Sequence, residues 1–366
     1  MKLFFYYPTS INAPANIGRE LFRNIYAMRN KLRFEIAIIA NHTDIKKLNL
    51  FYPDIAIYSI KSIKHELNEN SILHIPTSPF VAPNERFILH SLALLKKTPL
   101  IINYHGDIRL ETKYHLKNKE YKSSLSYLPS YALIPQLLKK SNQVIVNSDL
   151  MKNFLQKKYR TNSNVIPNAL NELWFRENVI KICHNSEPFI FYHGRLSYEK
   201  GVDILIQAYA QCVKKFNIKV NLYIAGQGPQ KKDLITLCKC LGLENKVFFL
   251  GFLKLDELKG YIQAAKALFY PSRYESFSLA ILEALLVAQG PVFFSNKAGI
   301  NDFVNREEIN LFHIHPDVES IYSAMKQTLT GINSGEDLII KQQKFAQNFT
   351  WEKIAPKYLD IYKKFG

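Results

Sequence analysis

Residues 188–210, PFIFYHGRLSYEKGVDILIQAYA, contain the pattern that decides the fold. The first five residues are continuously apolar or aromatic, which predicts a strand buried on both faces within a parallel sheet. Gly194 and Gly201 bound the next segment and permit a tight turn, and apolar residues then recur at helical spacing. A buried strand that turns directly into a helix is the building unit of doubly wound α/β folds.

The same alternation of strand and helix continues along the chain. The expected strands are KLFFYY, FEIAIIA, SILHIP, PLIINYHG and QVIVNS in the first half, and PFIFYHG, VNLYIAG, KVFFLG, ALFYPS and GPVFFS in the second. Because each half restarts the pattern, we expect an α/β protein with two Rossmann-like, doubly wound domains over 1–166 and 167–345, facing each other across a cleft. A C-terminal helix within 346–366 is expected to pack back toward the N-terminal domain.

The length and composition suit an intracellular protein of two domains. A chain of 366 residues with a hydrophobic content of 47% can form two cores of ordinary size. No apolar run approaches the roughly 18–20 residues of a membrane-spanning helix, and the apolar start is interrupted at Pro8, so we expect no signal peptide. The cysteines fit neither a disulfide framework nor a zinc site, which predicts structural thiols in the cytoplasm; they are Cys183, Cys212, Cys238 and Cys240.

The formal net charge is +17, and the basic excess is concentrated in the first half. Residues 1–180 contain 25 Lys and Arg against 13 Asp and Glu, whereas residues 181–366 contain 23 against 18. The densest basic stretches are 109–122 and 157–160. No nucleic-acid-binding module accompanies them, so we expect no nucleic-acid partner. Two interpretations stay open: an ordinary solvated face, or a basic face for a phosphorylated acceptor or for the anionic inner face of the cytoplasmic membrane, where the protein would be peripheral.

The turn GRLSYEKG, residues 194–201, places two cations beside the start of a helix. The N-terminus of a helix itself favours anions, so the addition of Arg195 and Lys200 suits a diphosphate. The alternative is a surface loop with two solvated charges.

The segment AGQGP after the next long strand resembles part of a dinucleotide-binding fingerprint. It contains Gly226 and Gly228, but Lys231 stands where that fingerprint has its third glycine. No such fingerprint follows the first strand of either half. A nicotinamide or flavin enzyme is therefore disfavoured.

The segment RYESFSLAILEA, residues 273–284, places two carboxylates where the surrounding pattern predicts burial. Glu275 lies in the turn before the expected helix, and Glu283 lies within the helix. An unpartnered buried carboxylate is costly, so protein groups or a ligand must satisfy each of them. A ribose diol is a ligand that suits Glu283, and a buried salt bridge to a Lys or Arg is the alternative.

The same segment offers backbone donors where the helix begins. Ser276 or Ser278 can cap the helix. The N–H groups of Phe277, Ser278 and Leu279 then lack acceptors within the helix and can face the cleft. Donors of this kind hold a phosphate or sugar hydroxyls.

Four linked segments occur in the order and at the intervals of one enzyme family: GRLSYEKGVDILIQAYA, LYIAGQGPQKKDL, VFFLGFLKLDELKGYIQAAKALFYPSRYESFSLAILEALLVAQGPV and FTWEKIAPKYLDIY. They resemble the retaining glycosyltransferases of family 4, which have the GT-B fold. In the C-terminal domain the resemblance covers about residues 190–300. It implies transfer of a sugar from a nucleotide diphosphate sugar, UDP-linked rather than GDP-linked, to a glycan or lipid-linked acceptor in the synthesis of cell-surface polysaccharide, lipopolysaccharide or glycolipid.

The resemblance also implies roles for residues of the C-terminal domain. Arg195 and Lys200 would hold the donor diphosphate, beside Gly194 in the same turn. Glu283 would bind the nucleotide ribose. Glu275, with the amides of Phe277 to Leu279, would grip the donor sugar and its phosphate and take part in catalysis.

In the N-terminal domain the resemblance rests on two short segments. His105 in NYHGD occupies the place of the family's histidine at the end of a strand, and would contact the donor sugar during catalysis. Gly18 in ANIGRE is the remaining glycine of the family's glycine-rich loop, which lies near donor and acceptor.

Several positions depart from the family's pattern. Ser276 and Ser278 stand where the family usually has glycines, and the N-terminal glycine pair is reduced to Gly18. After GPVFFS the usual Gly-Gly and Glu become AGIND, with Gly299 kept and Asp302 in the acidic place. These departures concern the identity of the sugar more than the class of reaction.

The departing diphosphate needs positive charge, from a divalent metal or from fixed cations and dipoles. Metal-dependent transferases hold the ion with two aspartates separated by one residue, and the chain contains no Asp-x-Asp. We therefore predict transfer without a metal or cofactor. Two alternatives stay open: another GT-B enzyme, such as a nucleotide-sugar epimerase or a phosphorylase, and an inactive carbohydrate-binding subunit.

Overall fold

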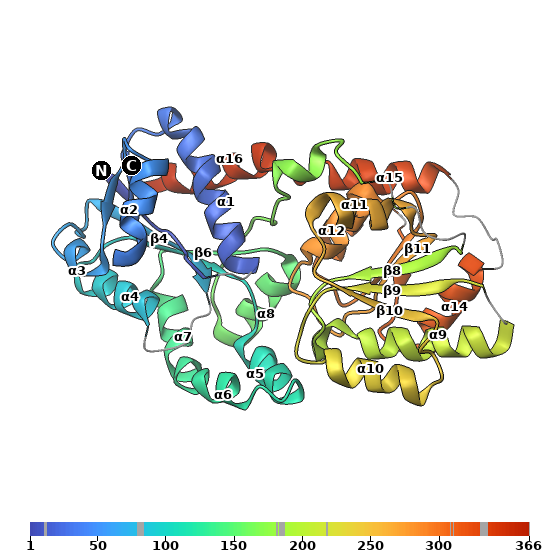
Figure 1. The fold of residues 1–366 in the computed structure, drawn as a ribbon. Helices are drawn as coiled ribbons and strands as arrows, with labels where there is room; N and C mark the ends of the chain where they lie inside the picture. Colours follow the sequence, from blue (N-terminus) through green and yellow to red (C-terminus); the bar gives the residue numbers. More distant parts are fainter. Residues whose placement is uncertain are drawn as a thin grey trace. The chain divides into compact units, whose positions relative to one another are not determined.

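The computed structural model confirms an α/β fold with two parallel sheets (Figure 1). It describes residues 1–10, 13–78, 84–180, 182, 187–216, 219–307, 309, 311–329 and 336–365. Cys183 lies outside the described residues. In the described part of the chain, no helix has both the length and the apolar character needed to cross a membrane.

The chain divides into two compact units. Unit 1 comprises Met1–Lys113, Tyr121–Asn171 and Thr350–Gly366. Unit 2 comprises Tyr114–Glu120 and Glu172–Phe349. The division therefore lies a few residues beyond the boundary expected from the sequence. It also assigns a short segment of the first half to unit 2, for which the sequence pattern contained no signal.

The sheet of unit 1 has the order β3-β2-β1-β4-β5-β6-β7 in the described chain, and its neighbouring strands are parallel. Its strands are β1 (Lys2–Tyr6), β2 (Glu35–Ile39), β3 (Ala56–Tyr58), β4 (Ser71–Ser78), β5 (Leu100–Tyr104), β6 (Gln143–Val146) and β7 (Asn164–Val165). The apolar runs predicted five of them. The other two, β3 and β7, are too short to show a periodic pattern.

The connections of unit 1 are mostly helical. The helices are α1 (Ala13–Ala27), α2 (His42–Phe51), α3 (Ile60–Ile63), α4 (Glu85–Leu95), α5 (Ile108–Lys117), α6 (Tyr121–Ser126), α7 (Leu128–Lys140), α8 (Asp149–Tyr159) and α16 (Trp351–Tyr362), with short 3₁₀ turns at η1 (Arg29–Lys31) and η4 (Lys363–Phe365). The last turn of α5 is counted with unit 2. The core of the unit consists of the buried central strands and the helix faces turned toward them.

The sheet of unit 2 has the order β10-β9-β8-β11-β12-β13, again parallel. Its strands are β8 (Phe189–His193), β9 (Asn221–Ala225), β10 (Val247–Gly251), β11 (Ala267–Tyr270), β12 (Val292–Ser295) and β13 (His313–Ile314). Its helices are α9 (Val202–Phe216), α10 (Lys231–Cys240), α11 (Leu255–Ala264), α12 (Leu279–Val287), α13 (Asn301–Arg306), α14 (Val318–Leu329) and α15 (Glu336–Ala346), with 3₁₀ turns at η2 (Glu172–Phe175) and η3 (Tyr198–Lys200). The two-residue strand β13 was not expected.

Both sheets reverse their winding direction beside their first strand. In unit 2 the first strand, β8, pairs with β9 on one side and with β11 on the other. In unit 1, β1 pairs with β2 and β4 in the same way. At such a switch point the order of the strands reverses, and ligands of open α/β sheets bind beside the carboxyl ends of the two central strands. The topology therefore gives each unit one favoured position for a ligand.

The C-terminal helix α16 belongs to unit 1 and packs against α1. Thr350 caps it by accepting a hydrogen bond from the Lys353 N–H at 3.3 Å. The Tyr362 hydroxyl donates to His74 Nδ1 at 2.6 Å, and His74 Nε2 donates to the side-chain oxygen of Asn103 at 2.9 Å. Buried polar contacts thus tie the helix to the central strands β4 and β5.

Candidate active site

The loops after β8 and β11 rest on each other at the switch point of unit 2. Gly201 ends the loop after β8 with a φ of 68°, and a Cβ there would lie 2.1 Å from the carbonyl oxygen of Pro271 in the loop after β11. Only glycine allows this approach without strain. The expected tight turn is therefore also a contact between loops.

Arg273 fixes the same pair of loops. Its guanidinium donates to both carboxylate oxygens of Asp203, at 2.8 and 2.7 Å, and to the Tyr198 carbonyl at 2.6 Å. Burial alone would lower the pKa of Arg273, but the Asp203 carboxylate raises it above its usual value. Arg273 is thus occupied by protein groups and holds the site together.

The glycine-rich segment after β9 packs against the loop after β8. Gly226 has a φ of 132°, and a Cβ on it would lie 1.9 Å from the Gly194 carbonyl oxygen. The Leu196 N–H donates to the Gln227 carbonyl at 2.9 Å. Close packing of two loops explains why this segment contains glycines although it lacks a complete dinucleotide-binding fingerprint.

Arg195 stands at the entrance of this loop with half of its side chain exposed. Its carbonyl accepts a hydrogen bond from the Tyr192 hydroxyl at 3.2 Å, while Gly194 before it donates its N–H to the Ala225 carbonyl at 3.1 Å. Its guanidinium forms an ion pair with Glu120 at 3.3 Å. The backbone is therefore fixed, and the cation at its end is accessible to a ligand.

Lys200 and Glu275, expected separately as ligands of the diphosphate and of the sugar, form an ion pair with each other. Both side chains are largely buried. The Ser272 hydroxyl adds a hydrogen bond to the same carboxylate oxygen at 3.4 Å. The pair holds both charges at the switch point, where each compensates the other.

The turn containing Glu275 and Phe277 is held by the loop after β12. The N–H of Gly299 donates to the Glu275 carbonyl at 3.0 Å, and the N–H of Ile300 donates to the Phe277 carbonyl at 3.2 Å. The Phe277 side chain is buried. The glycine retained in AGIND thus positions the acidic turn.

Helix α12 begins at Leu279, with Ser278 as its N-cap. The Ser278 hydroxyl accepts from the Ile281 N–H at 3.4 Å, whereas the N–H groups of Leu279 and Ala280 have no acceptor within the helix. Ser278 has a φ of 90°, a region that residues with a side chain rarely adopt. Of the three N–H groups expected as donors, that of Leu279 therefore lies in the first turn of the helix, directly after the strained Ser278.

Glu283 lies in α12 and contacts a histidine rather than a lysine or arginine. His193 Nε2 lies 3.0 Å from the Glu283 carboxylate, and the Tyr270 hydroxyl lies 2.7 Å from His193 Nδ1. The carboxylate can only accept, so Nε2 donates to it and Nδ1 accepts from the tyrosine. The contact with His193 thus orients the carboxylate through one of its two oxygens.

A pocket of about 340 Å³ lies beside Arg195 at the ends of β8, β9 and β10. It is lined by His193, Gly194, Arg195, Ala225, Gly226, Gln227, Gly251, Phe252, Leu253 and Leu258. Phe252 at this pocket is 84% exposed. The lining is largely apolar with one cation at its edge, which suits a flat ring attached to an anion.

In unit 1 the two expected residues have different surroundings. His105 Nε2 donates to the Pro76 carbonyl at 2.8 Å, and burial lowers the pKa of the imidazole. Gly18 is buried, and a Cβ there would lie 2.9 Å from the Pro8 ring. Gly18 thus lets α1 approach the loop after β1, and nothing in the described residues of unit 1 assigns it a ligand.

A smaller pocket of about 190 Å³ lies at the switch point of unit 1. Its polar lining includes Tyr6, Thr77, Glu85 and Arg86. The Tyr6 hydroxyl donates to Glu85 at 3.2 Å, and Arg86 donates to the Thr77 carbonyl at 3.2 Å. The Thr77 hydroxyl is buried and lacks a hydrogen-bond partner among the described residues. One acid and one base balance each other here, so the pocket suits an uncharged polar ligand.

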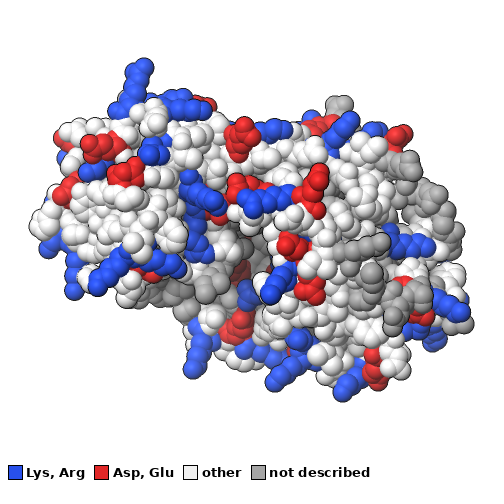
Figure 2. Space-filling view, turned by 45° about the horizontal axis from the view of Figure 1, so that its top comes forward, with Lys and Arg blue, Asp and Glu red and all other residues white. Residues whose placement is uncertain are grey.

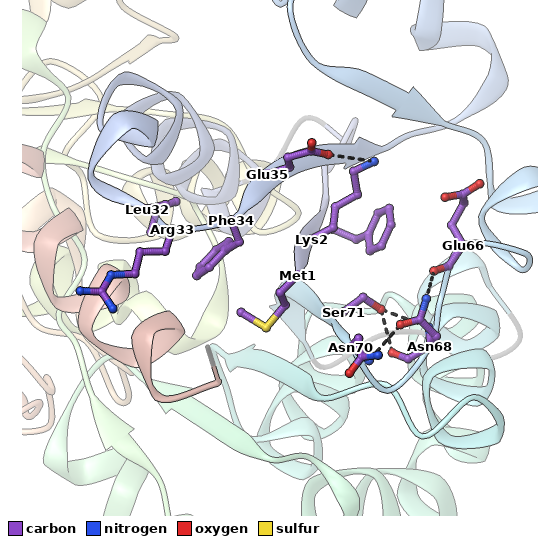
Figure 3. A pocket seen from close by; sticks show the side chains of 11 residues that line it. Met1, Lys2, Leu32, Arg33, Phe34, Glu35, Glu66, Asn68, Asn70 and Ser71 are labelled. Carbon is purple, nitrogen blue, oxygen red and sulfur yellow. Dashed lines mark hydrogen bonds and ion pairs between the residues drawn. The ribbon is translucent and has the colours of Figure 1, made fainter.

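A cavity of about 760 Å³ opens at the opposite edge of the same sheet (Figure 3). Its lining includes Lys2, Glu35 and Ser71, which begin β1, β2 and β4. Lys2 and Glu35 form an ion pair at 3.4 Å. The amino ends of parallel strands are not where such folds bind their ligands, so we do not assign this cavity to the active site.

Charged side chains of both signs lie on the face shown in Figure 2. Figure 2 shows lysine and arginine side chains interspersed with acidic ones on the viewed face. Unit 1 contains 26 Lys and Arg against 12 Asp and Glu, and unit 2 contains 22 against 19. The basic excess noted in the first half of the sequence therefore belongs almost entirely to unit 1.

Several residues that shape the site were not predicted from the sequence. His193 ends a buried strand, and this position is the signal that could have identified it, whereas His105 was identified by the family resemblance. Arg273 and Asp203 are 70 residues apart, and Glu120 and Arg195 are 75 apart. Pairs this distant carry no local signal.

Residues 176–345, nearly the whole of unit 2, match the family described as glycosyl transferases group 1. An uncharacterized glycosyltransferase of Methanocaldococcus jannaschii is 33% identical over 181 residues, which are 49% of this chain and 45% of that protein. The chain thus spans less than half of this relative. N-acetylgalactosamine-N,N'-diacetylbacillosaminyl-diphospho-undecaprenol 4-alpha-N-acetylgalactosaminyltransferase of Campylobacter jejuni is 26% identical, over 81% of this chain and 83% of its own.

Among solved structures, HepE of Anabaena in complex with UDP and glucose superposes with a TM-score of 0.72 at 18% identity, over the full length of both chains. At this identity the likeness shows the fold. Together with the family match in unit 2, it confirms the GT-B architecture that the sequence predicted. Residues 176–345 of the chain therefore match the group 1 glycosyltransferases, and the chain has the GT-B fold.

Proposed function

We propose that the chain transfers a sugar from a nucleotide diphosphate sugar to a glycan or lipid-linked acceptor, with retention at the anomeric carbon and without a metal ion. The observation that carries this proposal is the switch point of unit 2. There Arg195, the Lys200–Glu275 pair and the start of α12 lie on loops that contact one another. Cations and helix dipoles gathered at one edge of a sheet suit a diphosphate.

The electrostatics of the site support this assignment. Burial alone would raise the pKa of Glu199, but a hydrogen bond from the Ser197 hydroxyl and the charges of Lys200 and Arg195 lower it overall. Their field thus already stabilises a partly buried anion in the loop. The same field would stabilise the charge that develops on a departing diphosphate.

The reaction needs no covalent contribution from the protein. The bond between the anomeric carbon and the phosphate oxygen breaks while the acceptor oxygen bonds to that carbon, and the departing phosphate takes the acceptor's proton. Glu275 orients the donor sugar, and Glu283 holds the ribose through the oxygen left free by His193. His105 is kept neutral by burial and serves as a hydrogen-bond partner of the sugar rather than as a base.

Uracil is the base that we propose for the donor. The pocket beside Arg195 is apolar and ends in an exposed aromatic ring, Phe252. HepE, which shares the fold, is described in complex with UDP. Titration with UDP, GDP and ADP tests this choice. UDP should bind most tightly, and a clear preference for GDP or ADP would refute the uridine assignment.

The acceptor is proposed to be a saccharide on a lipid carrier. The neutral polar pocket at the switch point of unit 1 suits sugar hydroxyls, and the basic excess of that unit suits an anionic carrier or membrane. The relative from Campylobacter jejuni is named for transfer to a diphospho-undecaprenol-linked saccharide. Such an acceptor would place the enzyme peripherally on the cytoplasmic membrane, in the synthesis of surface polysaccharide or glycolipid.

The central experiment measures two quantities for the variants Arg195→Ala and Glu275→Ala: turnover of the donor and affinity for UDP. Loss of the Arg195 charge should weaken UDP binding about 10- to 100-fold, the effect of a hydrogen bond to a charged group. Loss of Glu275 should reduce turnover with little change in UDP affinity, because UDP lacks the sugar. Near-normal turnover of Glu275→Ala would reduce that residue to a structural role.

Metal independence has its own test. Fixed cations at the diphosphate site predict full turnover in excess EDTA. Turnover that falls in EDTA and returns with manganese would refute this part of the proposal and leave the transfer itself intact.

A further inference from the structure

The segment Tyr114–Glu120 is anchored on the proposed diphosphate loop of unit 2. Its central residue, Asn118, is buried. The Asn118 side-chain oxygen accepts from the Tyr198 N–H at 2.8 Å, and its amide donates to Glu199 at 3.4 Å. Asn118 thus binds the loop that contains Arg195 and Lys200, although it belongs to a segment far from that loop in the sequence.

Further contacts hold the segment at its other residues. Lys119 forms an exposed ion pair with Asp233 at 2.9 Å, and Lys117 lies 5.9 Å from the centre of the Tyr198 ring. The Tyr114 ring packs against the same tyrosine, with 6.1 Å between ring centres. The segment is therefore fixed in place even without the contact made by its last residue.

That last residue, Glu120, lies between the imidazole of His115 and the guanidinium of Arg195. One carboxylate oxygen lies 2.8 Å from His115 Nδ1. The Arg195 guanidinium donates to the two oxygens at 3.3 and 3.5 Å. The carboxylate thus occupies donors of Arg195 that the proposed function assigns to the donor diphosphate.

We propose that Glu120 is a specificity-determining residue that competes with the donor diphosphate for Arg195. This inference rests on the proposed function. A ligand must supply enough negative charge to replace the carboxylate, which a diphosphate does and an uncharged nucleoside or sugar does not. Glu120 thereby makes occupation of the site depend on the phosphates, and it returns to Arg195 when the nucleotide diphosphate leaves.

The expected effect is modest because the pair is partly exposed. Exposed ion pairs contribute between zero and about 1 kcal/mol, so its loss from the free protein should tighten UDP binding about two- to five-fold. Uridine has no phosphate with which to replace Glu120 on the Arg195 guanidinium, so its affinity should not change.

The experiment measures the affinity of the full chain for UDP and uridine by calorimetry. Glu120→Gln keeps the shape of the side chain and removes its charge. It should tighten UDP binding two- to five-fold and leave uridine binding unchanged. In an Arg195→Ala background the same substitution should not change the affinity for UDP, because the guanidinium for which Glu120 and the diphosphate compete is then absent. Glu120→Ala, measured in parallel, should agree in direction.

Asp233→Asn is the matched control, since it breaks the other ion pair of the segment and should leave UDP affinity unchanged. Weaker or unaltered UDP binding by Glu120→Gln would overturn the inference, as would an equal gain in the Arg195→Ala background or with Asp233→Asn. Failure of the proposed function is distinct: the wild-type protein would then bind none of UDP, GDP and ADP. Melting temperatures measured without ligand verify that each variant is folded.

Discussion

At the scale of single residues, Ser278 shows what a sequence pattern can and cannot predict. The resemblance identified two serines at usual glycine positions, and only one of them, Ser278, has a positive φ. Its hydroxyl caps α12 and stabilises the start of the helix, whereas its positive φ is an unfavourable backbone conformation. The pattern marked both positions as departures, but the dihedral angle depends on how the loop after β12 holds the turn.

Ser278→Gly should stabilise the protein. A positive φ of this kind costs on the order of 1–3 kcal/mol for a residue with a side chain, whereas replacing a serine cap by glycine costs only a few tenths. We expect a free energy of unfolding about 1 kcal/mol higher, measured by denaturant titration. The control is Ser276→Gly, which lacks the strain and should be neutral or destabilising. An equal gain in both variants would contradict the explanation.

At the scale of elements, α16 illustrates a contact that the sequence could suggest only in part. The closing segment was recognised as a helix expected to pack back toward the N-terminal domain. Its anchoring histidine, His74, is 288 residues away from Tyr362, and nothing near either residue indicates the other. In the neutral imidazole of His74 one nitrogen donates to Asn103 and the other accepts from Tyr362. Both nitrogens are therefore hydrogen-bonded, and a second proton on the ring would remove the acceptor.

The stability of unit 1 should therefore fall in mild acid. Burial lowers the pKa of His74 from 6.5 to about 4. The unfolded chain then binds more protons between these values, so the stabilisation is complete above pH 6.5 and is lost as the pH falls toward 4. His74 alone accounts for a loss of up to roughly 3 kcal/mol.

Denaturant titrations across this pH range measure the effect. His74→Gln should lower stability at neutral pH and show a flatter profile between pH 6.5 and 4. The exposed His65, changed in the same way, should leave the wild-type profile intact. The same slope in wild type and His74→Gln would show that other groups cause the acid sensitivity.

At the scale of the whole molecule, apolar strand runs and loop glycines predicted two α/β units and the loops that bear the site. Pairings among those loops could not be predicted, because they depend on which strand ends the sheet order places together. Glu283 with His193, Lys200 with Glu275 and Glu120 with Arg195 all depend on it. The charge of the two units also differs from that of the two sequence halves. The basic excess lies in unit 1, but the segment with Lys117 and Lys119 belongs to unit 2.

The assignment of residues to the two units indicates which lysines should bind an anionic membrane. Within the basic stretch 109–122, Lys119 is paired with Asp233 and Lys117 lies against Tyr198. Lys157 and Lys158, exposed in the last turn of α8, remain available. We expect salt-sensitive binding to vesicles with anionic lipid. Lys157→Gln with Lys158→Gln should weaken it by up to roughly 30-fold, at about 1 kcal/mol per lysine near the surface.

Sedimentation with vesicles of defined lipid composition provides the measurement. The matched control changes Lys214 and Lys215, which occupy the last turn of α9 in unit 2, and should bind like the wild type. If neutral and anionic vesicles retained the protein equally, the charge excess of unit 1 would be an ordinary solvated surface. If both double variants lost binding alike, net charge rather than a particular face of unit 1 would direct the protein to the membrane.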